Sequence, residues 1–201
     1  MSEYLPNGAF TTQTALRMQH DPASGQRWWF DAPLAGQLAV LLRVCSVGDF
    51  GCGIGLYTEY LNARGCRCRG FDGIPQIGQI TGGLVEYLDL SRPQTLDEVF
   101  DWVLCLEVLE HIPRDFEAVA LDTLHRHNRQ GVVISWAVPG QAGLGHVNCR
   151  PNEYVADWFV GHGYRHDLPT QQRLRQSASI AWLKNTLMVF RRSVPQEGDR
   201  S

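Results

Sequence analysis

The sequence predicts a doubly wound α/β domain built around a seven-stranded sheet. Short apolar runs alternate along the chain with segments of helical periodicity, and a glycine-rich loop follows the first strand-like run. The runs are apolar almost throughout, which is typical of parallel strands that helices cover on both faces. A length of 201 residues corresponds to one domain with a sizeable hydrophobic core.

The expected elements follow from these patterns in chain order. They are a helix over 35–44, a strand over 44–50, a helix over 56–65, strands over 66–71, 85–89 and 101–106, a helix over 115–127, a strand over 131–136, a helix over 152–160, and strands over 164–167 and 186–190. Asn152 is expected to cap the helix over 152–160. We expect residues 1–34 to form an N-terminal arm or lid, 35–193 the domain, and 194–201 a frayed polar tail.

The composition excludes several classes of protein. With 44% hydrophobic residues and a net charge of −3, the chain resembles a soluble globular protein, and attraction to nucleic acid is not expected. No apolar run reaches the roughly 18 residues of a membrane span. The six cysteines form no C-x-x-C motif and we find no basic-then-apolar signal pattern, so we expect a cytoplasmic protein. We also expect a monomer or a homodimer. Lys184 is the only lysine, which excludes a lysine-containing phosphate-binding loop.

A glycine loop follows the strand over 44–50. It reads D-x-G-x-G-x-G, with Asp49 followed by Gly51, Gly53 and Gly55. Ligands of open α/β sheets bind outside the carboxyl ends of the strands, and glycines there let the backbone approach a ligand closely. A tight turn without a ligand is the alternative, which three alternate glycines behind an acid disfavour. The third glycine comes one residue too early for a dinucleotide fingerprint, and Asp49 would repel a pyrophosphate but attract an amino group.

Two further acids complete this pattern. Asp72 ends the second expected strand, 23 positions after Asp49, where an acid commonly binds a ribose diol. Asp89 ends the third expected strand and could accept a hydrogen bond from an adenine amino group. The three acids together favour an adenosine that carries an amino acid rather than a phosphate chain.

On these motifs the sequence resembles the class I S-adenosylmethionine-dependent methyltransferases over roughly residues 40–191. The resemblance implies a Rossmann-like sheet of order 3-2-1-4-5-7-6 with the last strand antiparallel. It also implies that S-adenosyl-L-methionine is held by Asp49, Gly51, Gly53, Gly55, Asp72, Gly73, Asp89, Leu90, Leu106 and Glu107.

An E-x-x-E-H motif follows the fourth expected strand. Glu107 and Glu110 would share one face of a helical turn beside His111, and His146 follows the neighbouring strand. The motif resembles two branches of the superfamily, the ubiquinone-pathway O-methyltransferases and the small-RNA 2′-O-methyltransferases, of which the second holds magnesium with two glutamates and two histidines. The resemblance implies a possible Mg²⁺ site formed by Glu107, Glu110, His111 and His146.

Two other interpretations of the motif stay open. Acids at the start of a helix offset its dipole, and the first of them can line the cofactor pocket without any metal. His111, with His146, could then act as a general base, or His111 could be structural.

The acceptor is expected to be a small molecule, because the short arm leaves little chain to build a surface for a polymer. Its contacts are expected from the Gly/Pro-rich loop after the fifth strand and from the arm, through Trp28, Trp29, Trp136 and Asn148. The favoured function is O-methylation at His111 and His146. The alternatives are an N- or S-methyltransferase without metal, an RNA or protein methyltransferase, and a non-catalytic module that binds S-adenosylmethionine.

Overall fold

The computed structural model describes residues 3–20 and 28–193. Their centre is the predicted seven-stranded sheet, and its order β3-β2-β1-β4-β5-β7-β6 is the one that the family resemblance implies. Five strands pair in parallel, whereas β7 runs antiparallel to both β5 and β6. The strands are β1 (Ser46–Phe50), β2 (Arg67–Asp72), β3 (Val85–Tyr87), β4 (Phe100–Leu106), β5 (Asn128–Ser135), β6 (Tyr164–His166) and β7 (Met188–Arg192).

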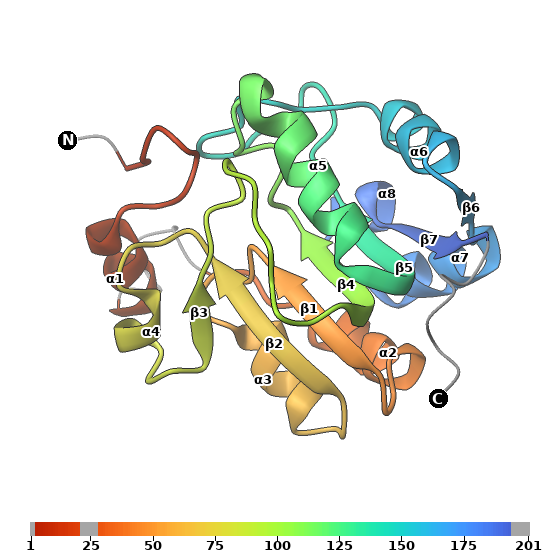
Figure 1. Cartoon of the computed structure of the whole chain (residues 1–201), viewed down its shortest axis with the longest axis horizontal. Helices are drawn as coiled ribbons and strands as arrows, with labels where there is room; N and C mark the ends of the chain where they lie inside the picture. The colour runs from red at the N-terminus through yellow and green to blue at the C-terminus, as the bar shows by residue number, and fades with distance from the viewer. Residues whose placement is uncertain (1–2, 21–27, 194–201) are drawn as a thin grey trace.

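Helices cover both faces of the sheet (Figure 1). One face carries α5 and α6, the other carries α2, α3 and α7, and α1 lies beside α4 next to the β3 edge. The helices are α1 (Thr12–His20), α2 (Ala32–Leu41), α3 (Leu56–Asn62), α4 (Ile77–Ile80), α5 (Glu117–Arg126), α6 (Asn152–Gly161), α7 (Leu168–Ser177) and α8 (Leu183–Thr186), with a 3₁₀ turn over Arg114–Phe116.

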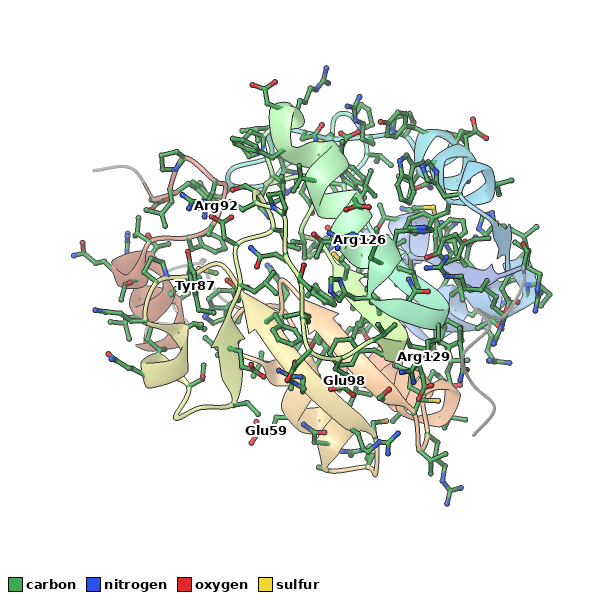
Figure 2. All side chains as sticks on the ribbon, in the orientation of Figure 1. Glu59, Tyr87, Arg92, Glu98, Arg126 and Arg129 are labelled. Atoms are coloured by element: carbon green, nitrogen blue, oxygen red, sulfur yellow. The ribbon has the colours of Figure 1, made fainter. Side chains whose placement is uncertain are left out.

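The central strands are buried on both sides, which explains their continuous apolar sequence. In β5, Val132 and Ile134 pack under α5 and α6, while Val133 packs toward α2 and α7. The same alternation in β4 places Val103 on one face and Leu104 on the other. Charged side chains lie around the periphery, among them the exposed Glu59, Arg126 and Arg129 labelled in Figure 2.

Four helices were not predicted: α1, α4, α7 and α8. The sequence of α7, LPTQQRLRQS, is polar because its outer face is solvated, and its buried face includes Leu174 and the polar Thr170 and Gln171. Its signals are at its start, where Asp167 accepts a hydrogen bond from the Thr170 amide and proline follows. The α8 turn ends at Thr186, so β7 begins at Met188 rather than at the expected residue 186.

Several predicted boundaries differ from the structure, and β5 for example begins at Asn128 instead of residue 131. The helix expected over 35–44 is α2, which begins at Ala32, so the expected arm boundary at residue 34 falls inside it. The third strand ends at Tyr87, so Asp89 follows it instead of ending it. Asn152 is the first residue of α6 after Pro151, and its side-chain amide donates to the Asn185 carbonyl rather than capping the helix. The tail over 194–201 lies outside the described residues. Within the ranges 3–20 and 28–193, no helix is long and apolar enough to cross a membrane.

Asp31 connects three segments that are distant in sequence. One carboxylate oxygen caps α2 by accepting from the Leu34 amide at 3.0 Å, and the other accepts from the amides of Ser179 and Ile180, each at 2.7 Å. The Asp31 amide in turn donates to the Tyr57 hydroxyl on α3. Asp31 is fully buried, so it fixes the segment before α8 against the start of α2.

Replacing Asp31 by alanine is expected to lower the free energy of unfolding by about 2–4 kcal/mol, because three backbone amides lose their acceptor in a buried position. Urea denaturation followed by circular dichroism measures the change. The exposed Asp157 on α6 provides the matched control, and Asp157→Ala should stay within about 0.5 kcal/mol of wild type. Equal effects of the two substitutions would contradict this role of Asp31.

Candidate active site

The glycine loop lies where the chain leaves β1, at the carboxyl edge of the sheet. Gly51, Gly53 and Gly55 have φ angles of +74°, +59° and +84°, a region that residues with a side chain rarely adopt. At Gly53 a Cβ atom would lie 2.4 Å from the Trp28 ring, so the loop backbone packs directly against an aromatic face. Gly55 directly precedes α3 as its N-cap residue, and its missing side chain makes room for Leu84 and Val85.

The buried carboxylate of Asp49 and the half-buried carboxylate of Asp72 support this loop. The Asp49 carboxylate accepts a hydrogen bond of 2.7 Å from the Thr58 hydroxyl on α3. Asp72 accepts from the Gly53 amide at 2.7 Å and from the Ile74 amide at 3.0 Å, one donor on each oxygen. Burial raises the pKa of Asp49 to about 7 and that of Asp72 to about 6, against the lowering effect of these hydrogen bonds. Both carboxyls therefore titrate close to neutral pH.

Two cavities open above the loop. The smaller, of about 100 Å³, is lined by residues after β2, β3 and β4 and is closed by the N-terminal segment 7–10. The larger, of about 430 Å³, extends from Asp49 toward α8. Both are lined by Phe10, Trp28, Gly51, Glu107 and His111, so the two cavities form one cleft that the Phe10 and Trp28 rings narrow.

The cleft contains nine of the ten expected cofactor residues. Asp72, Gly73, Asp89 and Leu90 line the smaller cavity, Asp49, Gly53 and Leu106 the larger, and Gly51 and Glu107 line both. Gly55 lines neither cavity; it contributes to the loop by allowing α3 to pack against Leu84 and Val85. One oxygen of Asp89 accepts from the amide and hydroxyl of Ser91, which fixes the carboxylate at the cavity wall.

Glu107 begins a tight turn at the end of β4. Its φ angle is +54°, and its amide donates to the Ser135 hydroxyl at 2.9 Å. The side chain accepts from the Gln141 amide at 2.8 Å and from the Thr186 hydroxyl at 3.3 Å. Because of this left-handed residue, Glu107 and Glu110 do not share the face of a helical turn, which corrects the arrangement expected from their spacing.

Glu110, His111 and His146 form a compact cluster, with one potential ligand atom from each within 4.8 Å of the others. Glu110 is fully buried, and neither of its carboxylate oxygens has a hydrogen-bond partner among the described residues. His146 Nε2 lies 4.0 Å from Glu110 Oε1. Burial and the nearby Glu107 raise the pKa of Glu110 well above its usual range, and burial lowers the pKa of His111 to about 4. Three of the four expected metal ligands thus meet, while Glu107 lies near Glu110 but outside this compact cluster.

Backbone carbonyls orient both imidazoles. His111 Nδ1 lies 3.2 Å from the Gly145 carbonyl, and His146 Nδ1 lies 3.1 Å from the Gln141 carbonyl. A carbonyl only accepts, so each Nδ1 is the protonated nitrogen. The lone pair of each neutral ring is therefore on Nε2, which is available to a proton or a cation.

The loop after β5 is hydrogen-bonded to the turn that contains Glu110. The amides of Val147 and Asn148 both donate to the Glu110 carbonyl at 2.9 Å. Asn148 also donates to Glu117 at the start of α5, a carboxylate that is paired with Arg150 as well. These contacts hold His146 against Glu110.

Two expected acceptor residues belong to this scaffold instead of the cavity. Trp136 is fully buried under α5 and α6, and its indole nitrogen donates to the Asn148 carbonyl at 2.6 Å. Asn148 is also fully buried. Neither side chain lines the cavities, because strand alternation turns Trp136 into the core and Glu117 draws Asn148 toward α5.

Trp28 and Trp29 both reach the larger cavity, as expected of acceptor-binding residues. Sequence reasoning missed a third tryptophan of this lining, Trp182, whose ring packs edge-on against Trp29 at a centroid distance of 5.0 Å. Ile180 and Leu183 also line this cavity. No sequence motif marks these residues as part of the site, because they lie far from the glycine loop along the chain. The hydrogen bonds of Asp31 to Ser179 and Ile180 bring their segment to the cleft.

The family described as a methyltransferase domain matches residues 37–166, more than half of the chain. The chain belongs to this family. A ubiquinone biosynthesis O-methyltransferase of Pseudomonas aeruginosa (strain UCBPP-PA14) is 31% identical over 165 residues, which cover 76% of this chain and 63% of that protein. This methyltransferase-domain chain therefore spans less than two thirds of the length of the curated relatives it matches.

Solved structures show the same fold. A sugar N-methyltransferase of Streptoalloteichus sp. ATCC 53650 has a TM-score of 0.63 at 17% identity, with 81% of this chain and 88% of that chain covered. A magnesium protoporphyrin IX methyltransferase of Synechocystis PCC 6803 has a TM-score of 0.59 at 18% identity, with 90% and 87% covered. The class I methyltransferase fold, and membership of the superfamily that the motifs indicate, are thus confirmed.

The raised pKa of Asp49 predicts a pH dependence of stability. The folded state binds the carboxyl proton more tightly than the unfolded state, so stability falls as pH rises from the unfolded pKa near 4 to about 7. Between pH 5 and pH 8 the wild type should lose about 2 kcal/mol relative to Asp49→Asn, which cannot ionise. Urea unfolding of both proteins at the two pH values measures the difference. Parallel pH profiles would show that Asp49 is ionised throughout.

Proposed function

We propose that this chain transfers the methyl group of S-adenosylmethionine to a hydroxyl of a small-molecule acceptor. The observation that carries the proposal is the continuous cleft, in which the glycine loop with Asp49 and Asp72 meets Glu110, His111 and His146. A cofactor held at the loop would lie next to groups that can take up a proton. The proposal agrees with the name of the curated relatives, which are O-methyltransferases.

The cofactor would be held along the cleft by its three parts. The Asp72 oxygens accept backbone hydrogen bonds from Gly53 and Ile74, and a carboxylate has further lone pairs that could accept from a ribose hydroxyl. Asp89 and Leu90 would flank the adenine in the smaller cavity. Asp49 would supply negative charge beneath the methionine part, and the glycines would let it lie close to the backbone.

Methyl transfer needs alignment more than activation. S-adenosylmethionine supplies a methyl group on a positively charged sulfur, so the leaving group is a neutral thioether. The acceptor oxygen forms a bond to the methyl carbon while the carbon–sulfur bond breaks, and the hydroxyl proton goes to a base. Nε2 of His111 or His146 is free to accept that proton. The aromatic side chains around the cleft exclude water and hold the acceptor in line.

The same cluster fits a divalent cation. Glu110 is buried without a hydrogen-bond donor among the described residues, and both histidines present an unprotonated Nε2. A cation held by Glu110, His111 and His146 would lower the pKa of an acceptor hydroxyl. Without a cation, His111 or His146 would serve as the base. The mechanism with a cation and the mechanism without one differ only in whether a metal is needed for activity.

The larger cavity suits a small, uncharged or cationic acceptor. Its described lining includes Trp29, Leu144 and Trp182, with acids at the base and no lysine or arginine. Pockets of this kind bind apolar ligands through their walls and orient them with few polar groups. An anionic acceptor would find no countercharge on this lining.

Isothermal titration tests the cofactor part of the proposal. Wild type should bind both S-adenosylmethionine and S-adenosylhomocysteine, and Asp72→Ala should weaken binding at least about tenfold, since the ribose loses a charged acceptor. Affinity should rise from pH 5.5 to pH 8 as Asp72 and Asp49, with pKa values of about 6 and about 7, become ionised. Glu59→Ala is the control, because Glu59 is exposed on α3, the helix that follows the glycine loop, and its loss should leave cofactor affinity unchanged. Absence of binding to wild type would overturn the proposal.

The acceptor chemistry is tested with S-adenosylmethionine and catechol as a probe, followed by mass spectrometry. We expect a methyl ether, and we expect His146→Ala to lower kcat by about 10²–10⁴-fold without changing cofactor affinity. An aromatic amine and a thiol of similar size serve as competing acceptors. Methylation of nitrogen or sulfur in preference to oxygen, or full activity of His146→Ala, would contradict O-methylation at this cluster.

A further inference from the structure

The cluster beside the cleft contains a donor set that differs from the one expected from its sequence motif. The E-x-x-E-H spacing implies two carboxylates and two imidazoles, but the structure brings together only Glu110, His111 and His146 among the described residues. Glu107 accepts from Gln141 and Thr186, which directs its carboxylate to the loop after β5 and to α8. The cluster therefore offers two nitrogen atoms and one carboxylate.

We infer that Glu110, His111 and His146 bind one borderline first-row transition-metal ion, of the class of Fe²⁺, Co²⁺ or Zn²⁺, and select it over Mg²⁺. The inference rests on the site of the proposed methyl transfer, but it concerns the identity of the ion and can be measured without turnover.

The first argument is the state of Glu110. Its carboxyl is fully buried and receives no hydrogen bond from the described residues, which is rare in proteins because desolvation of the group is not compensated. Inside the described part of the chain no lysine or arginine lines the cavity that Glu110 faces. His146 Nε2 lies 4.0 Å from Glu110 Oε1, which is too long for a hydrogen bond between the two atoms. A cation between them would satisfy both.

The second argument is the outer hydrogen bond of each imidazole. His111 and His146 both donate Nδ1–H to a backbone carbonyl, those of Gly145 and Gln141. Metal-binding histidines almost always make such a bond, which fixes the tautomer and the direction of the other nitrogen. His146 also depends on Gly143, where a Cβ atom would lie 2.0 Å from Nε2. Only glycine at this position leaves the His146 ring where it stands.

The third argument is the preference of the ions. Mg²⁺ prefers six oxygen ligands and keeps several waters, whereas imidazole suits iron, cobalt and zinc. Two histidines and one carboxylate on one side of an ion leave positions open on the other. In this structure the open side is the larger cavity, which Glu110 and His146 both line. An acceptor hydroxyl could bind there.

The full chain, treated with chelator and dialysed into metal-free buffer, is titrated with Co²⁺, Zn²⁺ and Mg²⁺ by calorimetry. Co²⁺ binding is followed in parallel by visible absorption. We expect one equivalent of Co²⁺ or Zn²⁺, bound at least about tenfold more tightly than Mg²⁺. Equal or tighter binding of Mg²⁺ would overturn the inference.

Variants separate the ligands from their neighbours. Glu110→Gln and His146→Gln should weaken Co²⁺ binding by about tenfold or more, and Gly143→Ala should weaken it while every donor is kept. Glu107→Gln should leave it within about threefold, which separates this donor set from the four-ligand one. Cys149→Ser is the control for thiol binding, since its sulfur lies 3.9 Å from His146 Nδ1. Loss of Co²⁺ binding in Glu107→Gln or Cys149→Ser as large as in Glu110→Gln would overturn the assignment.

Circular dichroism melting and S-adenosylmethionine titration accompany every variant. A variant that still binds the cofactor is folded, so its loss of Co²⁺ binding can be assigned to the ligand. If wild type binds S-adenosylmethionine but no metal, the inference fails while the proposed methyl transfer stands. If neither binds, both fail.

Discussion

The pairing of β1 with β4 is the constraint on which the site depends. The two strands are more than 50 positions apart in sequence, yet Val47, Gly48 and Asp49 lie beside Trp102, Val103 and Leu104 in parallel register. Their connections leave in opposite directions, so a crevice opens between the glycine loop after β1 and the turn after β4. Every carboxylate and imidazole of the cleft lies at this edge. The close pairing requires glycine at position 48, where a Cβ atom would lie 2.5 Å from the Phe100 ring.

Backbone hydrogen bonds hold the turn after β4 in place, so its side chains are not needed to stabilise it. The Glu110 carbonyl accepts from two amides of the loop after β5, and the Glu107 amide donates to Ser135. The side chain of Glu110 makes no such bond to the described residues, although it is fully buried. A turn fixed by its backbone can hold an unpaired carboxylate in place, which is the preorganisation that a binding site requires. The left-handed conformation of Glu107 is a local cost of the same arrangement.

The sheet and most of the cofactor side of the cleft could be predicted because they follow local rules, whereas the strand order came from the resemblance to class I methyltransferases. Glycines behind an acid at the end of a buried strand are typical of a ligand-binding loop, and the structure places Asp49 and Asp72 accordingly. The acceptor side could not be predicted in the same way. Trp136 follows β5 and Trp182 precedes α8, but the core encloses the first and the second lines the cleft. Trp182 reaches the cleft because Asp31 positions the segment between α7 and α8. The sequence of α7 shows no apolar helical periodicity, so this arrangement could not be predicted.

The larger cavity concentrates buried carboxyl groups, at a cost to the stability of the fold. Asp49, Glu107 and Glu110 all line it, and burial raises the pKa of each. The only lysine, Lys184, is exposed on α8 and lies on a different surface with Arg175, so it cannot neutralise them or act as a base there. Stability alone would favour apolar residues at these positions. Buried carboxyl groups that lower stability are expected where function requires them.

The matching partners of these carboxylates are cations from outside. They are the sulfonium and ammonium groups of the proposed cofactor near Asp49, and the proposed metal ion near Glu110. Asp49 and Glu110 both line the larger cavity, so a positively charged methyl donor and a metal-bound acceptor oxygen would approach each other there. The Phe10, Trp28 and His111 rings line the same cavity and would help to exclude water from it.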